Sequence, residues 1–180
     1  MVRGGNRSEV ELAADIRNWD GKSNESIESV FKEYKDDFWF ATACLECLED
    51  DELQSGASWL LKKFAETDGE LSSIQTDEFC ETFSKLKGWS AKLHVLQTVP
   101  FMKIEHNHQQ ALERFVRHCL ADRNKMVRAW ALNGFFVLAN HFPEYQEESS
   151  VLLEAGLNDE SPAVRARARN ILKTSEFLKW

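Results

Sequence analysis

Apolar residues recur along this chain at spacings of three and four, in segments separated by short polar turns. Such spacing places the apolar side chains on one face of a helix. No run of alternating apolar and polar residues lies between turn signals, so no β-sheet is expected. The pattern predicts about nine helices, one near residues 26–35 and then four pairs, of which the first two occupy 38–48 with 53–64 and 79–86 with 89–99.

A stretch of the C-terminal half occurs twice. The segment LADRNKMVRAWALNGF, from Leu120 to Phe135, corresponds to LNDESPAVRARARNIL, from Leu157 to Leu172, and seven of the sixteen positions are identical. Each copy follows an apolar helix and contains an Asp, a short polar turn and Val-Arg-Ala at the start of a second helix. A fixed period of roughly 20–50 residues indicates a repeat architecture, in which each unit buries its apolar face against the next.

The polar turn of each copy predicts how its second helix begins. Ser161 and Pro162 suit the N-cap and the first helical position, and Asn124 can cap the equivalent helix. The Asp that precedes Arg by six residues favours the helix N-terminus, and the Arg can bridge to that carboxylate or to the neighbouring repeat. Small residues on both second helices allow close packing of the paired helix: Ala129, Ala131, Ala166 and Ala168.

These segments resemble HEAT repeats, and their Val-Arg-x-x-Ala element is similar to the HEAT-like class. The resemblance covers residues 107–173 and is weak upstream, where the Asp…Val-Arg element is missing. It implies an armadillo-like, right-handed α-solenoid of about four HEAT-like helix pairs plus an N-terminal helix. In that family the Asp and Arg form a ladder along the stacked turns. The residues that match the ladder are Asp122, Arg128, Asp159 and Arg165.

The alignment of the copies singles out position 130. Its counterparts are Arg167 and, in the weaker upstream copy, Lys92, so the position is normally solvated, yet here it holds Trp130. An exposed Trp there would lie on or beside the concave surface with which solenoids bind their partners. The alternative is that Trp130 packs into the core of the adjacent repeat. The predicted contact residues are Lys92, Trp130, Asn133, Arg167 and Asn170.

Length and composition indicate one domain. The chain has 180 residues, of which 43% are apolar, and we expect a flexible terminus over residues 1–8 and a single HEAT-like domain over 9–180. No apolar run of about 18 residues and no secretory signal are found, which favours a cytoplasmic protein. Residues 1–105 hold 12 basic and 21 acidic side chains, whereas residues 106–180 hold 10 and 9.

Other polar clusters have alternative interpretations. The acidic block 49–52 is a solvated turn or a docking site for a basic partner. The CxxC of Cys44 and Cys47 lies in an apolar helix, so buried thiols are favoured over metal or redox use, and the same holds for Cys80 and Cys119. Trp59 and Trp89 are expected in the core.

Histidine chemistry is weakly indicated. His106 and His108, with Glu105, lack further ligands at a recognised spacing, and a solvated loop is the preferred interpretation. His94 lies within a helix and is packed or functional. We assign no catalytic residue, metal or cofactor, because no phosphate loop, nucleophile elbow or paired zinc-ligand cluster is found.

The sequence thus favours a protein-interaction or scaffold module, with another protein as its partner, over an enzyme. The alternative is a HEAT-like enzyme, such as a DNA glycosylase for alkylated bases or a phycobilin lyase-like protein. The net charge of −8 disfavours nucleic acid, whose phosphates require a cationic surface. At the C-terminus, the apolar Phe177 and Trp180 fold back over the last helix or support self-association.

Overall fold

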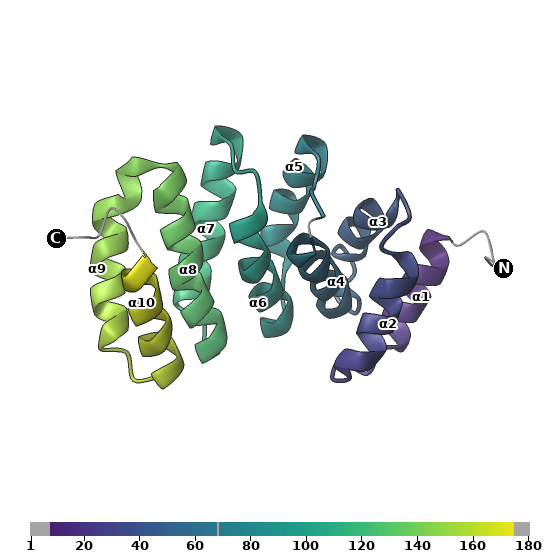
Figure 1. Ribbon diagram of the computed structural model, residues 1–180, viewed down its shortest axis with the longest axis horizontal. Coiled ribbons are helices and arrows are strands. Elements are labelled where there is room, and N and C mark those ends of the chain that lie inside the picture. The colour runs from purple at the N-terminus through teal and green to yellow at the C-terminus, as the bar shows by residue number, and fades with distance from the viewer. Residues whose placement is uncertain (1–7, 68, 175–180) are drawn as a thin grey trace. The chain divides into compact units, whose positions relative to one another are not determined.

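The computed structural model describes residues 8–67 and 69–174 (Figure 1). Within these residues the protein contains ten α-helices and no strand, which confirms the predicted all-α class. The helices are α1 (Glu9–Asn18), α2 (Asn24–Tyr34), α3 (Phe40–Cys47), α4 (Gln54–Glu66), α5 (Ser73–Thr82), α6 (Trp89–Thr98), α7 (Gln109–Leu120), α8 (Lys125–His141), α9 (Gln146–Leu157) and α10 (Pro162–Thr174). None of the described helices is long and apolar enough to cross a membrane.

The chain divides into two compact units. Residues 1–94 contain α1 to α5 and the start of α6, and residues 95–180 contain the end of α6 and α7 to α10. We call them the first and the second unit, and each is described by itself. The single domain expected over residues 9–180 stays a prediction.

One helix of the first unit was not expected from the sequence. In α1, Ser8 and Glu11 form a capping box in which the Ser8 N–H donates to Glu11 Oε2 at 2.9 Å and the Glu11 N–H donates to Ser8 Oγ at 3.3 Å. Only Leu12 and Ile16 of this helix are buried. Two buried positions are too few to give a clear period, and the expected count of nine was therefore one short.

The core of the first unit is built from aromatic and aliphatic side chains of successive helices. The ring centroids of Phe31 and Phe40 lie 5.9 Å apart, and those of Phe40 and Phe64 lie 5.7 Å apart. A Cβ on Gly56 of α4 would lie 2.7 Å from Cγ2 of Ile16, so glycine permits α1 and α4 to approach closely.

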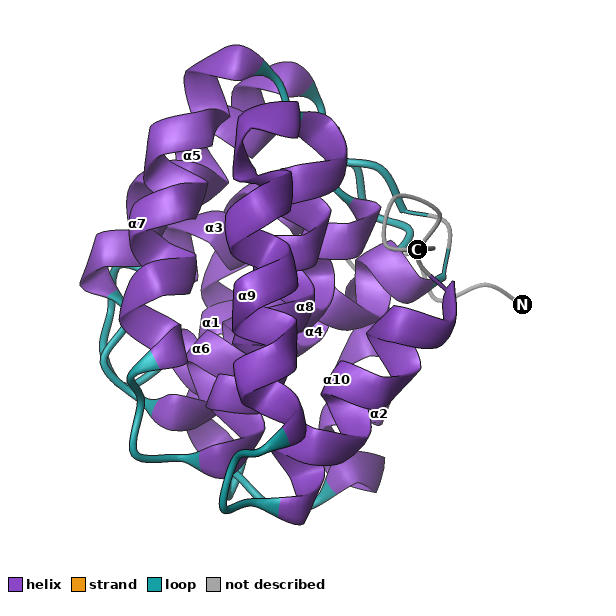
Figure 2. Ribbon diagram, turned by 90° about the vertical axis from the view of Figure 1, so that its left-hand side faces the viewer, coloured by secondary structure: helices purple, strands orange, loops and turns teal. Residues whose placement is uncertain are grey.

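The second unit contains the two helix pairs that the repeat predicted. Figure 2 shows α8, α9 and α10 side by side, and α8 also packs against α7. One core cluster lies between α8, α9 and α10, and it consists of Ala129, Leu132, Leu153, Val164, Ala168 and Ile171. A Cβ on Gly156 of α9 would lie 3.2 Å from the Cβ of Ala168, so small residues allow these helices to pack closely.

Candidate functional site

In the turns before α8 and α10, an Asp carboxylate accepts the backbone N–H of the residue two positions later. Asp122 Oδ1 accepts the N–H of Asn124 at 2.8 Å, and Asp159 Oδ1 accepts the N–H of Ser161 at 2.7 Å. Asn124 caps α8 as predicted, because its Oδ1 accepts the N–H of Met126 at 2.9 Å. The expected cap by the Ser161 side chain is wrong, since Ser161 Oγ is buried without a hydrogen-bond partner.

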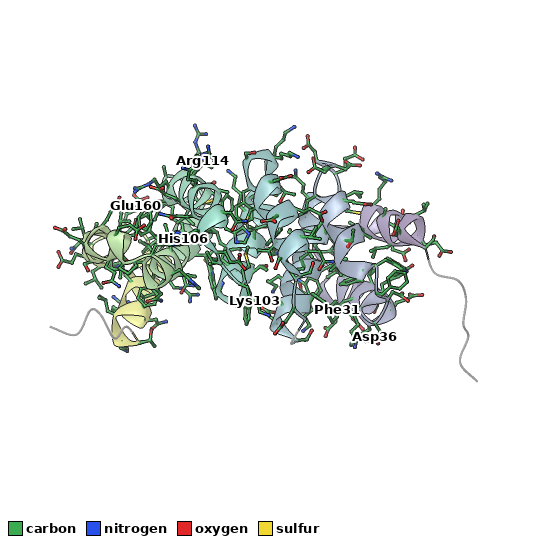
Figure 3. All side chains as sticks on the ribbon, turned by 90° about the horizontal axis from the view of Figure 1, so that it is seen from above. Phe31, Asp36, Lys103, His106, Arg114 and Glu160 are labelled. Carbon is green, nitrogen blue, oxygen red and sulfur yellow. The ribbon has the colours of Figure 1, made fainter. Side chains whose placement is uncertain are left out.

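The two predicted ladder arginines bind the same turns. Arg128 Nη1 donates to the carbonyl oxygen of Asp122 at 3.1 Å, and Arg165 Nη1 donates to that of Asp159 at 2.7 Å. Arg128 Nη2 also lies 3.4 Å from Asp159 Oδ1, which joins one turn to the next. Exposed Glu160, labelled in Figure 3, lies at the same distance from Arg128 Nη2. These contacts hold the turns in place.

Trp130 and Arg167 are in direct contact. The guanidinium carbon of Arg167, on α10, lies 3.8 Å from the ring centroid of Trp130, on α8. Both side chains are half-buried, so Trp130 is neither fully exposed nor part of the buried core. Burial lowers the pKa of the Arg167 guanidinium. A guanidinium stacked on an indole is stabilised by about 0.5–2 kcal/mol, which holds both groups in place.

Four of the five predicted contact residues lie on two neighbouring helices. Asn133 is half-buried and one turn after Trp130 on α8, and Asn170 is exposed and one turn after Arg167 on α10. The Trp130–Arg167 stack therefore brings together the two helix faces that carry these four residues. We call Trp130, Asn133, Arg167 and Asn170 the stack surface. Lys92 is half-buried in α6 and belongs to the first unit.

Two apolar residues that lie beside the stack surface were not predicted. Met126 precedes Trp130 by four residues and is 38% exposed, and Val137 follows it by seven and is half-buried. Both intervals return to the same face of a helix. The helical spacing around Trp130 would have identified them.

Charges on the first helices of the second unit are paired internally. Arg117 of α7 binds Glu148 of α9 through two hydrogen bonds of 2.5 and 2.8 Å and also binds Glu113 at 3.0 Å. The carboxylate of Glu148 raises the pKa of Arg117, and Arg117 lowers the pKa of Glu148. Tyr145 donates its hydroxyl to Glu113 at 2.9 Å. Arg114, by contrast, is exposed and extends outward from α7 (Figure 3).

The acidic block 49–52 is also paired, within the first unit. Arg17 Nη2 lies 2.9 Å from Asp50, and Lys85 Nζ lies 2.7 Å from Glu49. The remaining pairs are Arg17 with Glu52 and Lys87 with Asp51. The block is therefore an ion-paired turn with little free charge to attract a basic partner.

All four cysteines are buried free thiols, as the sequence favoured. Burial raises the pKa of Cys44 well above its usual value and raises those of Cys47 and Cys80 to about 11 and about 12. A thiol acts as a nucleophile or metal ligand in its deprotonated form. The CxxC motif therefore lacks the ready thiolate that redox chemistry needs.

The histidines of the predicted solvated loop differ in their environments. His106 is exposed and its ring centroid lies 5.2 Å from that of Phe142, whereas His108 is buried. The loop prediction is wrong for His108, because its Nδ1 accepts the N–H of Glu105 at 3.0 Å and the ring fills the core beside α7. Over the described ranges, no three His, Cys, Asp or Glu side chains are grouped so as to hold a metal ion.

His94 is packed against α4. Its Nδ1 lies 3.1 Å from Oγ of the buried Ser58. Burial, with the positive charge of Lys62, lowers the pKa of His94 to about 4. The core prediction for Trp89 is wrong, since this residue begins α6 and is 55% exposed, whereas Trp59 is half-buried below Lys62.

Neither a protein-family model, nor a characterised protein, nor a solved structure matches this chain. Its function must therefore be inferred from the described residues themselves. Phe177 and Trp180, the predicted self-association residues, lie outside those residues, so that hypothesis stays a prediction.

Proposed function

We propose that this chain is a HEAT-like, right-handed α-solenoid and acts as a cytoplasmic protein-interaction or scaffold module. Its binding site is the stack surface on α8 and α10, the second helices of two successive pairs. Two features support the repeat assignment: in both turns an Asp carboxylate accepts a backbone N–H and an Arg donates to the carbonyl of that Asp, and Arg128 joins one turn to the Asp159 carboxylate of the next.

The observation that carries the binding function is the Trp130–Arg167 stack. Tryptophan and arginine are among the residue types that dominate binding energy at protein interfaces. Here they lie in contact at 3.8 Å and are partly open to solvent. The two side chains restrict each other's motion before a partner binds. A partner that packs on this surface therefore immobilises few additional side-chain conformations, which lowers the entropic cost of binding.

The test is affinity capture from cell lysate with wild type, Trp130→Ala and the matched control Phe38→Ala. Phe38 lies between α2 and α3 and is 97% exposed, so the control removes an aromatic ring from another surface. Equal folded content is checked by circular dichroism. A specific partner should be retained by Phe38→Ala and weakened roughly 30-fold by Trp130→Ala. Retention of every partner by Trp130→Ala, or recovery of nuclease-sensitive nucleic acid in place of protein, would contradict the proposal.

A further inference from the structure

Charge is segregated among the last three helices of the second unit, α8, α9 and α10. The second helices α8 and α10 contain no Asp or Glu, and their basic residues are Lys125, Arg128, Arg165, Arg167, Arg169 and Lys173. The first helix α9 is the reverse, with three glutamates and no Lys or Arg. A partner that meets the α8–α10 side of this unit therefore meets helices that carry cations only.

Arg167, the cation of the stack surface, has no anionic partner in the described part of the chain. Within the described residues its guanidinium makes no hydrogen bond and no ion pair, and its contact is with the Trp130 ring. Arg128 and Arg165 differ, because both bind carbonyl groups of their own turns. Arg117 on α7 differs too, because two carboxylates surround it.

No hydrogen bond between described residues uses the donors of Arg167. A guanidinium presents five N–H groups in its plane, and stacking on an aromatic ring uses only its face. The edge can then donate two parallel hydrogen bonds to one carboxylate. Arg167 is half-buried, so its cation is partly desolvated, and this burial lowers its pKa. A bound carboxylate would restore the stabilisation that water no longer supplies.

The neighbours of Arg167 favour a short acidic peptide over a nucleic acid. Arg169, two residues further along the same helix, lies about 200° around its axis and belongs to another face. The residues around the stack are the apolar Met126 and Val137 and two asparagines. A phosphodiester strand requires a row of cations, whereas a carboxylate next to an apolar side chain requires one cation and an apolar contact.

We infer that the stack surface binds an acidic peptide segment of a partner protein, with one carboxylate on the edge of the Arg167 guanidinium and an adjacent apolar side chain on Trp130. This inference rests on the proposed function, since it names the chemistry of the partner at the same surface. Asn133 and Asn170 lie on the faces that flank the stack, where their amides can bind the backbone of the segment.

The probe is a displayed library of random 12-residue peptides, selected on the full chain and followed by fluorescence anisotropy of a selected peptide. We expect enrichment of Asp or Glu beside an apolar residue. Arg167→Ala should weaken binding roughly 10–100-fold. The matched control Arg169→Ala removes the same charge from another face and should change affinity less than about threefold. Arg167→Glu should restore binding when the peptide carboxylate is replaced by Lys.

Several outcomes overturn the inference: no selected peptide, selected peptides without acidic enrichment, equal loss in Arg167→Ala and Arg169→Ala, or equal displacement by a 12-nucleotide single-stranded DNA. The proposed function fails separately, when Trp130→Ala retains every lysate partner. A partner lost in Trp130→Ala, together with selected peptides that are neutral or basic, would refute the acidic segment and leave the interaction surface in place.

Discussion

Mild acid should destabilise the first unit through His94. This side chain is held neutral in the folded protein, because burial and the charge of Lys62 lower its pKa to about 4. Its Nδ1 lies 3.1 Å from Oγ of Ser58, which is itself fully buried. A proton on this partly buried ring would place a second positive charge near Lys62.

The sign and size of the effect follow from the two pKa values. In the unfolded chain the ring titrates near its ordinary value of 6.5 and is protonated below it, whereas in the folded protein it stays neutral down to about 4. Stability is therefore complete above pH 6.5 and is lost as the pH falls toward 4. The difference in free energy of unfolding is about 2 kcal/mol at pH 5 and about 3 kcal/mol below pH 4.

The measurement is urea unfolding followed by circular dichroism at pH 7.5 and pH 5.0. Wild type should lose about 2 kcal/mol more than His94→Gln, because the glutamine side chain does not titrate in this range and can still hydrogen-bond to Ser58. His141→Gln, which removes an exposed histidine of α8, should keep the loss of the wild type. An equal loss in wild type and His94→Gln would show that the ring takes up its proton in the folded state.

Two further substitutions test the packing and the turns of the second unit. Gly156→Ala places a Cβ 3.2 Å from the Cβ of Ala168. The resulting strain of about 1–3 kcal/mol exceeds the gain of about 1 kcal/mol in helix propensity, so the urea midpoint should fall. An unchanged or higher midpoint would mean that α9 moves away freely. Asp159→Ala removes the acceptor of the Ser161 N–H and should lower the free energy of unfolding by about 1–3 kcal/mol. The control Glu160→Ala, at an exposed residue, should change it by less than about 0.5 kcal/mol. Equal effects of the two substitutions would contradict a role for the Asp159 turn.

Local patterns in the sequence predicted the elements that depend on local causes. The cap of α8 by Asn124 is one case, because capping depends only on the residues of the turn and the first helical N–H groups. The start of α5 is the opposite case. It begins at Ser73, six residues before the expected 79, because Ser72 and Gln75 form a capping box that extends the helix over a polar turn with few buried residues. A search for apolar residues at spacings of three and four does not detect such a turn.

Contacts between helices were harder to predict. The repeat alignment placed Trp130 and Arg167 at equivalent positions, and so it gave two separate contact residues rather than one stacked pair. The stack forms because a long, flexible side chain extends from α10 to the neighbouring α8, and this depends on how closely the helices pack. The burial of His108 is similar, since it depends on the fold of the turn from Glu105 rather than on the polar character of the residues around it.

The net charge of a sequence segment does not show how its charged side chains are distributed over the surface, and the second unit is an example. Residues 106–180 hold nearly equal numbers of basic and acidic side chains, which by itself predicts no preference for an acidic or a basic partner. Among the last three helices the two signs are nevertheless placed on different elements, because α9 carries glutamates and α8 and α10 carry no carboxylate. Most of the described carboxylates are used internally, as in the Arg117–Glu148 pair, whereas Arg167 has no such partner among the residues that the structure describes. An approaching protein responds to the field within about 8–10 Å rather than to the net charge of the chain. The selectivity of the stack surface therefore depends on the pairing of its charges and not on their number.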